Sequence, residues 1–280
     1  MNTPLHRLLV VTVPVDSIDF ASDILWSAGA QAVEEITVGE RCDLRTDFGS
    51  DPLQRWAEVV ATHDTARHWA VRIDTVDASA ADTWRAHARP TIVGAFRLLP
   101  AWLTSEPDAG LCDVVIEPGG SFGIGDHPTT RATLALAQRI PASSVLDLGC
   151  GSGVLGIALA KARGTRAVCV DIAPAAVEAT NANARLNGVE HLLVVEAGDI
   201  TVVRGTYDLV LANILAPVLL ADAARIAATV ASRGALVTSG FTSTRRADIV
   251  AGYTALGLTL TGEYDVDGWL ALQFERLEQR

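Results

Sequence analysis

The chain has 280 residues, 49% of them hydrophobic and 5% aromatic, so it can bury the core of one large domain or of two modest ones. Its formal net charge is −11 and it contains no lysine or arginine run, which argues against a nucleic-acid-binding protein. The sequence shows no signal-peptide pattern at its start and no apolar stretch of the roughly 20 residues that a membrane span requires. The four cysteines have no metal-ligand spacing, which favours reduced thiols in a cytoplasmic protein and predicts no metal site.

The first 78 residues show a β-α-β-β-α-β order, the split βαβ pattern of a ferredoxin-like domain. The expected strands have alternating or continuous apolar residues, and the expected helices begin at Asp16 or Ser17 and at Pro52. The strands are predicted at 8–15, 32–38, 41–48 and 68–77, and the helices at 16–29 and 52–64.

Residues 79–103 are expected to connect this domain to a second one. The segment ASAADTWRAHA should be helical until Pro90, because the residue before a proline avoids the α region. The following IVGAFRLLPAW should be a strand or an extended entry to the next domain. Trp84 and Trp102 fit either core packing or contact with a partner.

From residue 104 to residue 280, apolar strands alternate with alanine-rich helices, which indicates right-handed βαβ units and a mostly parallel sheet. The last two strands are separated by a short turn, so they should form an antiparallel hairpin at one edge of the sheet. The strands are predicted at 112–118, 144–150, 166–172, 191–197, 207–214, 234–241, 258–267 and 269–277, and the helices at 131–140, 153–164, 174–188 and 216–231.

A glycine-rich turn, VLDLGCGSG, lies between a strand and a helix. Its glycines, Gly149, Gly151 and Gly153, allow tight turning and close approach to a nucleotide-like ligand. Asp171 ends the next strand, where a carboxylate accepts hydrogen bonds from ribose hydroxyls. Asp199 follows the third strand and either accepts the exocyclic amine of an adenine or caps a helix or turn.

The carboxylate of Asp147 inside this loop indicates which cofactor binds. It would repel the pyrophosphate of a dinucleotide, but it suits the cationic amino group of S-adenosylmethionine, which makes NAD or ATP the weaker alternative. The sequence D-L-G-C-G-S-G resembles the first motif of class I methyltransferases. That resemblance implies a Rossmann-like domain with a seven-stranded sheet, and we add Ile172, next to Asp171, to the expected cofactor-binding residues.

Asn213 ends the fourth strand and is followed by Ile214, Leu215 and Ala216. Many class I enzymes that methylate nitrogen have an asparagine or aspartate at this place. No aromatic residue follows it here, so the loop suits a flexible alkyl amine better than a planar amide or base.

Three segments together resemble the ribosomal protein L11 methyltransferase family (PrmA): EPGGSFGIGDHPTTRATL, VLDLGCGSGVLGIALAK and LVLANILA. The resemblance implies a ferredoxin-like domain for substrate recognition at 1–78, a linker at 79–103 and a methyltransferase domain at 104–280. It also implies methylation of lysine or N-terminal amines on a basic ribosomal large-subunit protein. The sequence departs from the family pattern at Glu117, Ser121, Ile124 and Asp126, and at Ala88-Arg89-Pro90 in the linker.

The resemblance also implies roles for the residues around GIGDHPTT. This loop would be a cofactor lid in which Gly123 allows closure, Phe122 covers the ligand, and Thr129 and Thr130 bind the methionyl portion. The side-chain oxygen of Asn213, with the carbonyl of Ile214, would orient the acceptor amine.

Several alternatives remain open at this stage. His127 is either a participant in the chemistry or a structural residue, and the pattern contains no convincing strong base. The acceptor could be a different protein or a small-molecule amine. The remaining hypothesis is a cofactor-binding module without enzymatic activity.

Overall fold

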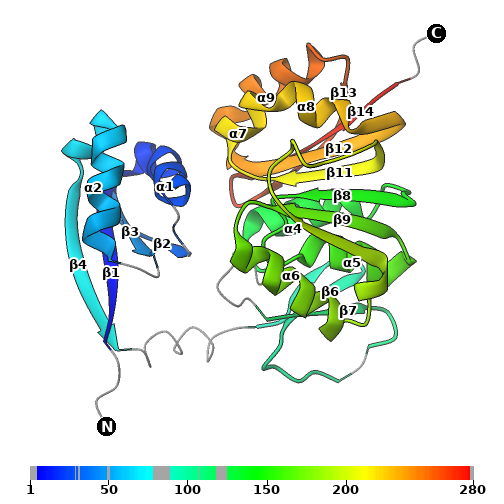
Figure 1. Ribbon diagram of the computed structural model, residues 1–280, viewed down its shortest axis with the longest axis horizontal. Helices are drawn as coiled ribbons and strands as arrows, with labels where there is room; N and C mark the ends of the chain where they lie inside the picture. Colours follow the sequence, from blue (N-terminus) through cyan, green and yellow to red (C-terminus); the bar gives the residue numbers. More distant parts are fainter. Residues whose placement is uncertain are drawn as a thin grey trace. The chain divides into compact units, whose positions relative to one another are not determined.

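The computed structural model describes residues 5–28, 30, 32–48, 51–77, 89–106, 108–117 and 125–277, which form two compact units (Figure 1). The first unit contains the described residues up to 77, and the second contains those from 89 onward. In these ranges no helix combines the length and the apolar character needed to cross a membrane.

The first unit is a four-stranded antiparallel sheet in the order β2-β3-β1-β4, with two helices packed on one face. This is the ferredoxin-like arrangement that the sequence predicts. Its elements are β1 (Leu5–Pro14), α1 (Ile18–Ser27), β2 (Ala32–Val38), β3 (Arg41–Asp47), α2 (Pro52–Thr62) and β4 (Ala70–Asp77), with 3-10 turns at Val15–Ser17 and Asp64–His68.

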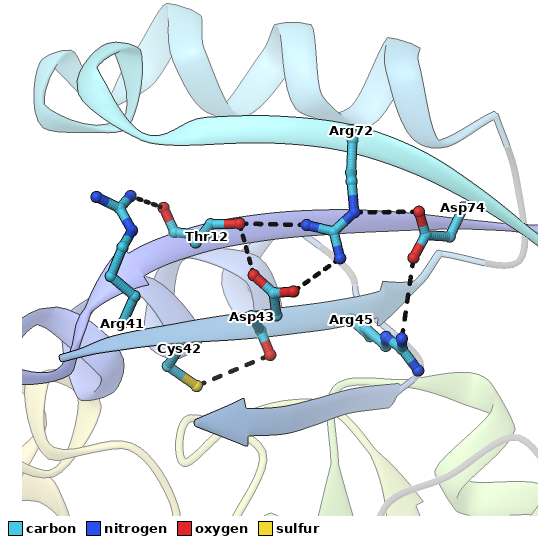
Figure 2. A network of polar contacts seen from close by, with 7 residues as sticks. All are labelled: Thr12, Arg41, Cys42, Asp43, Arg45, Arg72 and Asp74. Carbon is cyan, nitrogen blue, oxygen red and sulfur yellow. Dashed lines mark hydrogen bonds and ion pairs between the residues drawn. The ribbon is translucent and has the colours of Figure 1, made fainter. Parts of the chain in front are cut away.

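The two faces of this sheet differ because strand side chains alternate. Cys42 and Leu44 of β3 are buried in the core beneath the helices. On the opposite face the guanidinium of Arg72 donates to Asp43 at 2.7 Å and to Asp74 at 3.2 Å (Figure 2). The hydrogen bond from Arg72 lowers the pKa of Asp43, so the Arg72–Asp43 ion pair persists at neutral pH.

The expected helix of the connector lies outside the described residues, as does Trp84, and Trp102 is half-buried. The second half of the connector forms two strands that belong to the second unit. They form a three-stranded sheet with the strand predicted at 112–118, in the order β5-β6-β7, and its apolar side chains join the core of the second unit. These strands are β5 (Thr91–Val93), β6 (Phe96–Pro100) and β7 (Cys112–Ile116).

The main sheet of the second unit has seven strands in the order β10-β9-β8-β11-β12-β14-β13. Strands β8 to β12 are parallel to one another, and β14 is antiparallel to both β12 and β13. The predicted Rossmann-like sheet and its terminal hairpin are therefore confirmed. The strands are β8 (Ser144–Leu148), β9 (Arg166–Asp171), β10 (Leu193–Ala197), β11 (Tyr207–Asn213), β12 (Val230–Thr242), β13 (Thr259–Val266) and β14 (Trp269–Glu275).

Helices cover both faces of this sheet. Buried side chains of α4 and α5 pack on one face, and those of α7, α8 and α9 pack on the other. The helix predicted at 216–231 is two shorter helices separated at Asp222. The helices are α4 (Pro128–Ala137), α5 (Val154–Arg163), α6 (Pro174–Leu186), α7 (Ala216–Ala221), α8 (Ala223–Ala228) and α9 (Arg246–Thr254), with 3-10 turns at Glu190–Leu192 and Ser243–Arg245.

Candidate functional site

The carboxyl ends of β8, β9, β10 and β11 meet at one edge of the second unit. The strand order reverses between β8 and β11, and ligands of open α/β sheets bind where this reversal occurs. The sequence-predicted glycine turn follows β8, Asp171 ends β9, Asp199 follows β10 and Asn213 ends β11. The topology therefore brings these predicted site residues to the same edge.

The glycine turn requires its glycines for conformational reasons. Gly149, Gly151 and Gly153 have φ values of 70°, 54° and 79°, which side-chain-bearing residues adopt at a cost. The amides of Gly149 and Cys150 donate to the carbonyl of Val170 at 2.8 and 3.1 Å. The turn is therefore anchored to the end of β9, beside Asp171.

The Asp171 carboxylate is fixed by backbone amides on both sides. It accepts hydrogen bonds from Gly151 and Ala173, each at 2.9 Å. A carboxylate has about four acceptor positions, so two remain for hydroxyl groups such as those of a ribose. The neighbouring Ile172 is 77% exposed and offers an apolar surface at the same strand end. These features fit the adenosine portion of the expected cofactor.

Asp147 is 1% exposed and only partly satisfied. Its Oδ2 accepts from the amide of Gly156 at 2.9 Å, whereas Oδ1 has no hydrogen-bond partner in the described part of the chain. Burial, with a smaller contribution from the charge of Asp171, raises the pKa of Asp147 to about 7. A buried acceptor without a donor fits a ligand that carries an ammonium group.

Asp199 takes the capping role that the sequence left open. Its Oδ1 accepts from the amide and the hydroxyl of Thr201 at 2.8 and 2.5 Å, and these bonds lower its pKa. Gly198 donates to the carbonyl of Asp171 at 2.9 Å, so Asp199 follows directly after a residue bonded to Asp171. Recognition of an adenine amine by Asp199 stays a prediction.

His127 is the N-cap of α4, which begins at Pro128, earlier than the predicted periodic run. Its Nδ1 accepts from the amide of Thr129 at 3.3 Å and lies 2.8 Å from the hydroxyl of the same residue. Burial lowers the pKa of His127 to about 4, so the ring is neutral at pH 7 and can act as an acceptor. These N-cap contacts fit the structural alternative for this histidine.

The two threonines of the predicted lid lie in the first turn of α4. Thr129 and Thr130 are each 2% exposed, and the hydroxyl of Thr129 faces His127. Phe122 and Gly123 lie outside the described residues. Cofactor binding by these four residues stays a prediction.

β11 ends at Asn213, and the loop that begins with Ile214 packs against the glycine turn. A side chain on Gly149 would overlap that of Ile214, and the amide of Ile214 donates to the carbonyl of Ser239 at 3.1 Å. The side-chain amide of Asn213 has no hydrogen-bond partner among the described residues. The loop after β11 therefore packs against the turn after β8 and presents an amide that can bind a ligand.

Sequence reasoning did not identify the residues of α6 that contact the glycine turn. Thr180 donates to the carbonyl of Gly151, and Asn183 donates to that of Ser152, each at 2.9 Å. Both side chains are fully buried. Polar residues repeated on one face of the alanine-rich segment PAAVEATNANARLNG were the available signal.

Comparisons with known proteins agree with this architecture. A family model described as "Ribosomal protein L11 methyltransferase (PrmA)" matches residues 11–277. The ribosomal protein L11 methyltransferase of Myxococcus xanthus is 39% identical over 197 residues, covering 69% of this chain and 67% of the relative. That of Symbiobacterium thermophilum is 34% identical over 237 residues, covering 83% and 75%. A crystal structure of a ribosomal protein L11 methylase from Lactobacillus delbrueckii is 25% identical with a TM-score of 0.61, covering 66% of this chain and 96% of that one.

Proposed function

Because this chain belongs to the ribosomal protein L11 methyltransferase family, we propose that it methylates lysine side-chain or N-terminal amines of ribosomal protein L11. The enzyme is a methyltransferase, and its methyl donor is S-adenosylmethionine, which supplies an activated methyl group on a sulfonium. The close approach of Ile214, in the loop after Asn213, to Gly149 of the glycine turn is the observation that supports methyl transfer at this edge of the sheet.

The chemistry requires positioning more than acid–base catalysis, because methyl transfer from a sulfonium is an in-line displacement. A lysine amine with a reference pKa near 10.4 is neutral for only about 0.1% of the time at pH 7.4. Desolvation beside the apolar Ile214 would increase the neutral fraction. The side-chain oxygen of Asn213 and the carbonyl of Ile214 would accept hydrogen bonds from the N–H groups of the amine and leave its lone pair directed at the methyl group.

Acceptor recognition is assigned to the first unit in this proposal. The second unit contains every strand of the seven-stranded sheet and all the described residues of the site, whereas the first has its own core. An acidic chain of net charge −11 is complementary to a basic ribosomal protein. The proposal also places the enzyme in the cytoplasm, where ribosomal proteins are found.

The test is incubation of the full-length protein with labelled S-adenosylmethionine and purified ribosomal protein L11, followed by intact-mass and peptide analysis. We expect mass increments of about 14 Da per methyl group on amines of L11, and a much slower appearance of these increments with Asn213→Ala under the same conditions. A chain that begins at Arg89 keeps β5, β6 and β7 and should bind the cofactor while losing transfer to L11. Full transfer by this shorter chain would favour a small-molecule acceptor, and transfer only to other proteins would favour a different protein acceptor.

A further inference from the structure

One face of α6 and its C-cap carries a buried polar stripe, formed by Thr180, Asn183 and the C-cap residue Asn187. The three side chains are 0%, 0% and 8% exposed. Their spacing of three and four residues places them along one side of the helix. Buried polar groups are retained where they satisfy other polar groups, so the partners of this stripe indicate its role.

Asn183 and Asn187 take the place of a neighbouring β-strand at β7. Strand β7 pairs with β6 along one edge only. On its other side, Asn187 accepts from the amide of Val115 at 2.9 Å and donates to the carbonyl of Val115 at 2.6 Å. Asn183 likewise accepts from the amide of Glu117 and donates to its carbonyl, each at 2.9 Å. The two side-chain amides thus satisfy the backbone groups of Val115 in β7 and of Glu117 directly after it.

Thr180 and Asn183 hold the glycine turn. Asn183 uses its second amide hydrogen for the carbonyl of Ser152, and the hydroxyl of Thr180 donates to the carbonyl of Gly151. A trans peptide is planar, so fixing a carbonyl also fixes the direction of the amide that follows it. Two successive peptide planes of the turn are therefore set by side chains of α6.

Asn187 does not share this second role. The second amide hydrogen of Asn187 goes to the carbonyl of Asn183 at 2.8 Å, and Lys161 donates to its oxygen at 3.0 Å. Neither partner belongs to the glycine turn. The stripe therefore contains two residues that contact the turn and one that contacts only β7 and its surroundings.

We propose that Thr180 and Asn183 are positioning residues for S-adenosylmethionine, which act by fixing the glycine turn, whereas Asn187 serves the stability of β7 alone. This inference rests on the proposed function only for the identity of the cofactor, S-adenosylmethionine. Both residues act through the glycine turn and not on the transferred methyl group. Substituting them should therefore weaken cofactor binding rather than lower the rate at saturating cofactor.

The experiment measures binding of S-adenosylhomocysteine to the full-length protein by calorimetry, together with thermal unfolding and the KM and kcat for the methyl donor. Thr180→Val keeps the shape of the side chain and removes the donated hydrogen bond. For this variant and for Asn183→Ala we expect about ten-fold weaker binding and a matching rise in KM, the equivalent of one typical hydrogen bond. The kcat should stay within about three-fold, because uniform binding is lost rather than transition-state stabilisation.

Two controls separate positioning from general destabilisation. Thr180→Ser retains the hydroxyl and should restore binding to within about two-fold of the wild type. Asn187→Ala should lower the melting temperature as much as Asn183→Ala does, and should leave binding within about two-fold.

Two results would overturn the inference. Wild-type binding by Thr180→Val would do so even if Asn183→Ala failed to fold, and so would an equal loss of binding in Asn187→Ala. Failure of the wild-type protein itself to bind S-adenosylhomocysteine would instead contradict the cofactor.

Discussion

The side chain of Ile214 lies so close to Gly149 that a methyl group on this glycine would overlap it. Gly149 also has a φ of 70°, a conformation that costs other residues about 1–3 kcal/mol. The turn after β8 and the loop after β11 are therefore packed as one unit, which joins the expected cofactor site to the expected acceptor site.

Gly149→Ala should accordingly weaken S-adenosylhomocysteine binding by at least about ten-fold and destabilise the protein by about 1–3 kcal/mol. Ile214→Ala should relieve the overlap but not the backbone strain. Denaturant unfolding of both single variants and the double variant measures the coupling between them. Strictly additive free energies of unfolding would show that the two residues do not constrain each other.

Asp171→Ala should bind S-adenosylhomocysteine about ten- to a hundred-fold more weakly, because a charge-assisted acceptor contributes about 1.5–3 kcal/mol. Calorimetry measures this directly. Asp265→Ala is the matched control, since Asp265 also accepts a backbone amide hydrogen, that of Gly268 at 3.0 Å, in the β13–β14 turn. An Asp171 variant with the affinity of this control would contradict the ribose assignment.

Asn213→Ala should slow methyl transfer far more than it weakens cofactor binding. Loss of the group that orients the amine should raise the barrier by about 2–4 kcal/mol, on the order of thirty- to a thousand-fold in kcat. Asn213→Asp keeps an acceptor oxygen and should lose less. Steady-state kinetics and cofactor calorimetry on the same preparations separate the two effects, and a loss explained by cofactor binding alone would place the chemistry elsewhere.

His127→Asn should reduce the acid sensitivity of folding. The folded pKa of about 4 lies below the ordinary value of 6.5, so the unfolded chain binds more protons between these values. The contribution of His127 to stability is thus complete above pH 6.5 and is lost as the pH falls towards 4. Asparagine is a good N-cap without a titrating ring, so the variant should show a shallower fall in unfolding free energy over this range. A large loss of kcat at pH 8 would instead indicate a catalytic histidine.

Asp147→Asn should show the opposite pH effect. The folded pKa of about 7 lies above the ordinary value of 3.8, so the native state holds the proton more tightly than the unfolded chain does. Wild-type stability should therefore fall as the pH rises from about 4 to about 7, and the variant should lack this component. If an ammonium group binds near Asp147, the wild type should also release protons on binding S-adenosylhomocysteine at pH 6.5. Calorimetry in two buffers of different ionisation enthalpy detects this release, and its absence would contradict the ammonium assignment.

Features that depend on residues close together in the chain could be predicted from the amino-acid sequence. The tight turn at Gly149, Gly151 and Gly153 was expected because three glycines lie between a strand and a helix, and all three have positive φ angles. The place of Asp171 at a strand end followed from the apolar run before it. The alternation of strands and helices limited the topology, because parallel crossovers are right-handed and ligands bind where the strand order reverses.

Features that depend on contacts between distant segments could not be predicted in this way. Asn183 meets Glu117 and Asn187 meets Val115 across separations of 66 and 72 residues, and no local periodicity specifies such pairs. The neutral state of His127 and the raised pKa of Asp147 arise from burial by other elements, because desolvation depends on everything that packs around a group. The pairing of β7 with β6 rather than with the main sheet is likewise a property of the assembled core that a single segment does not contain.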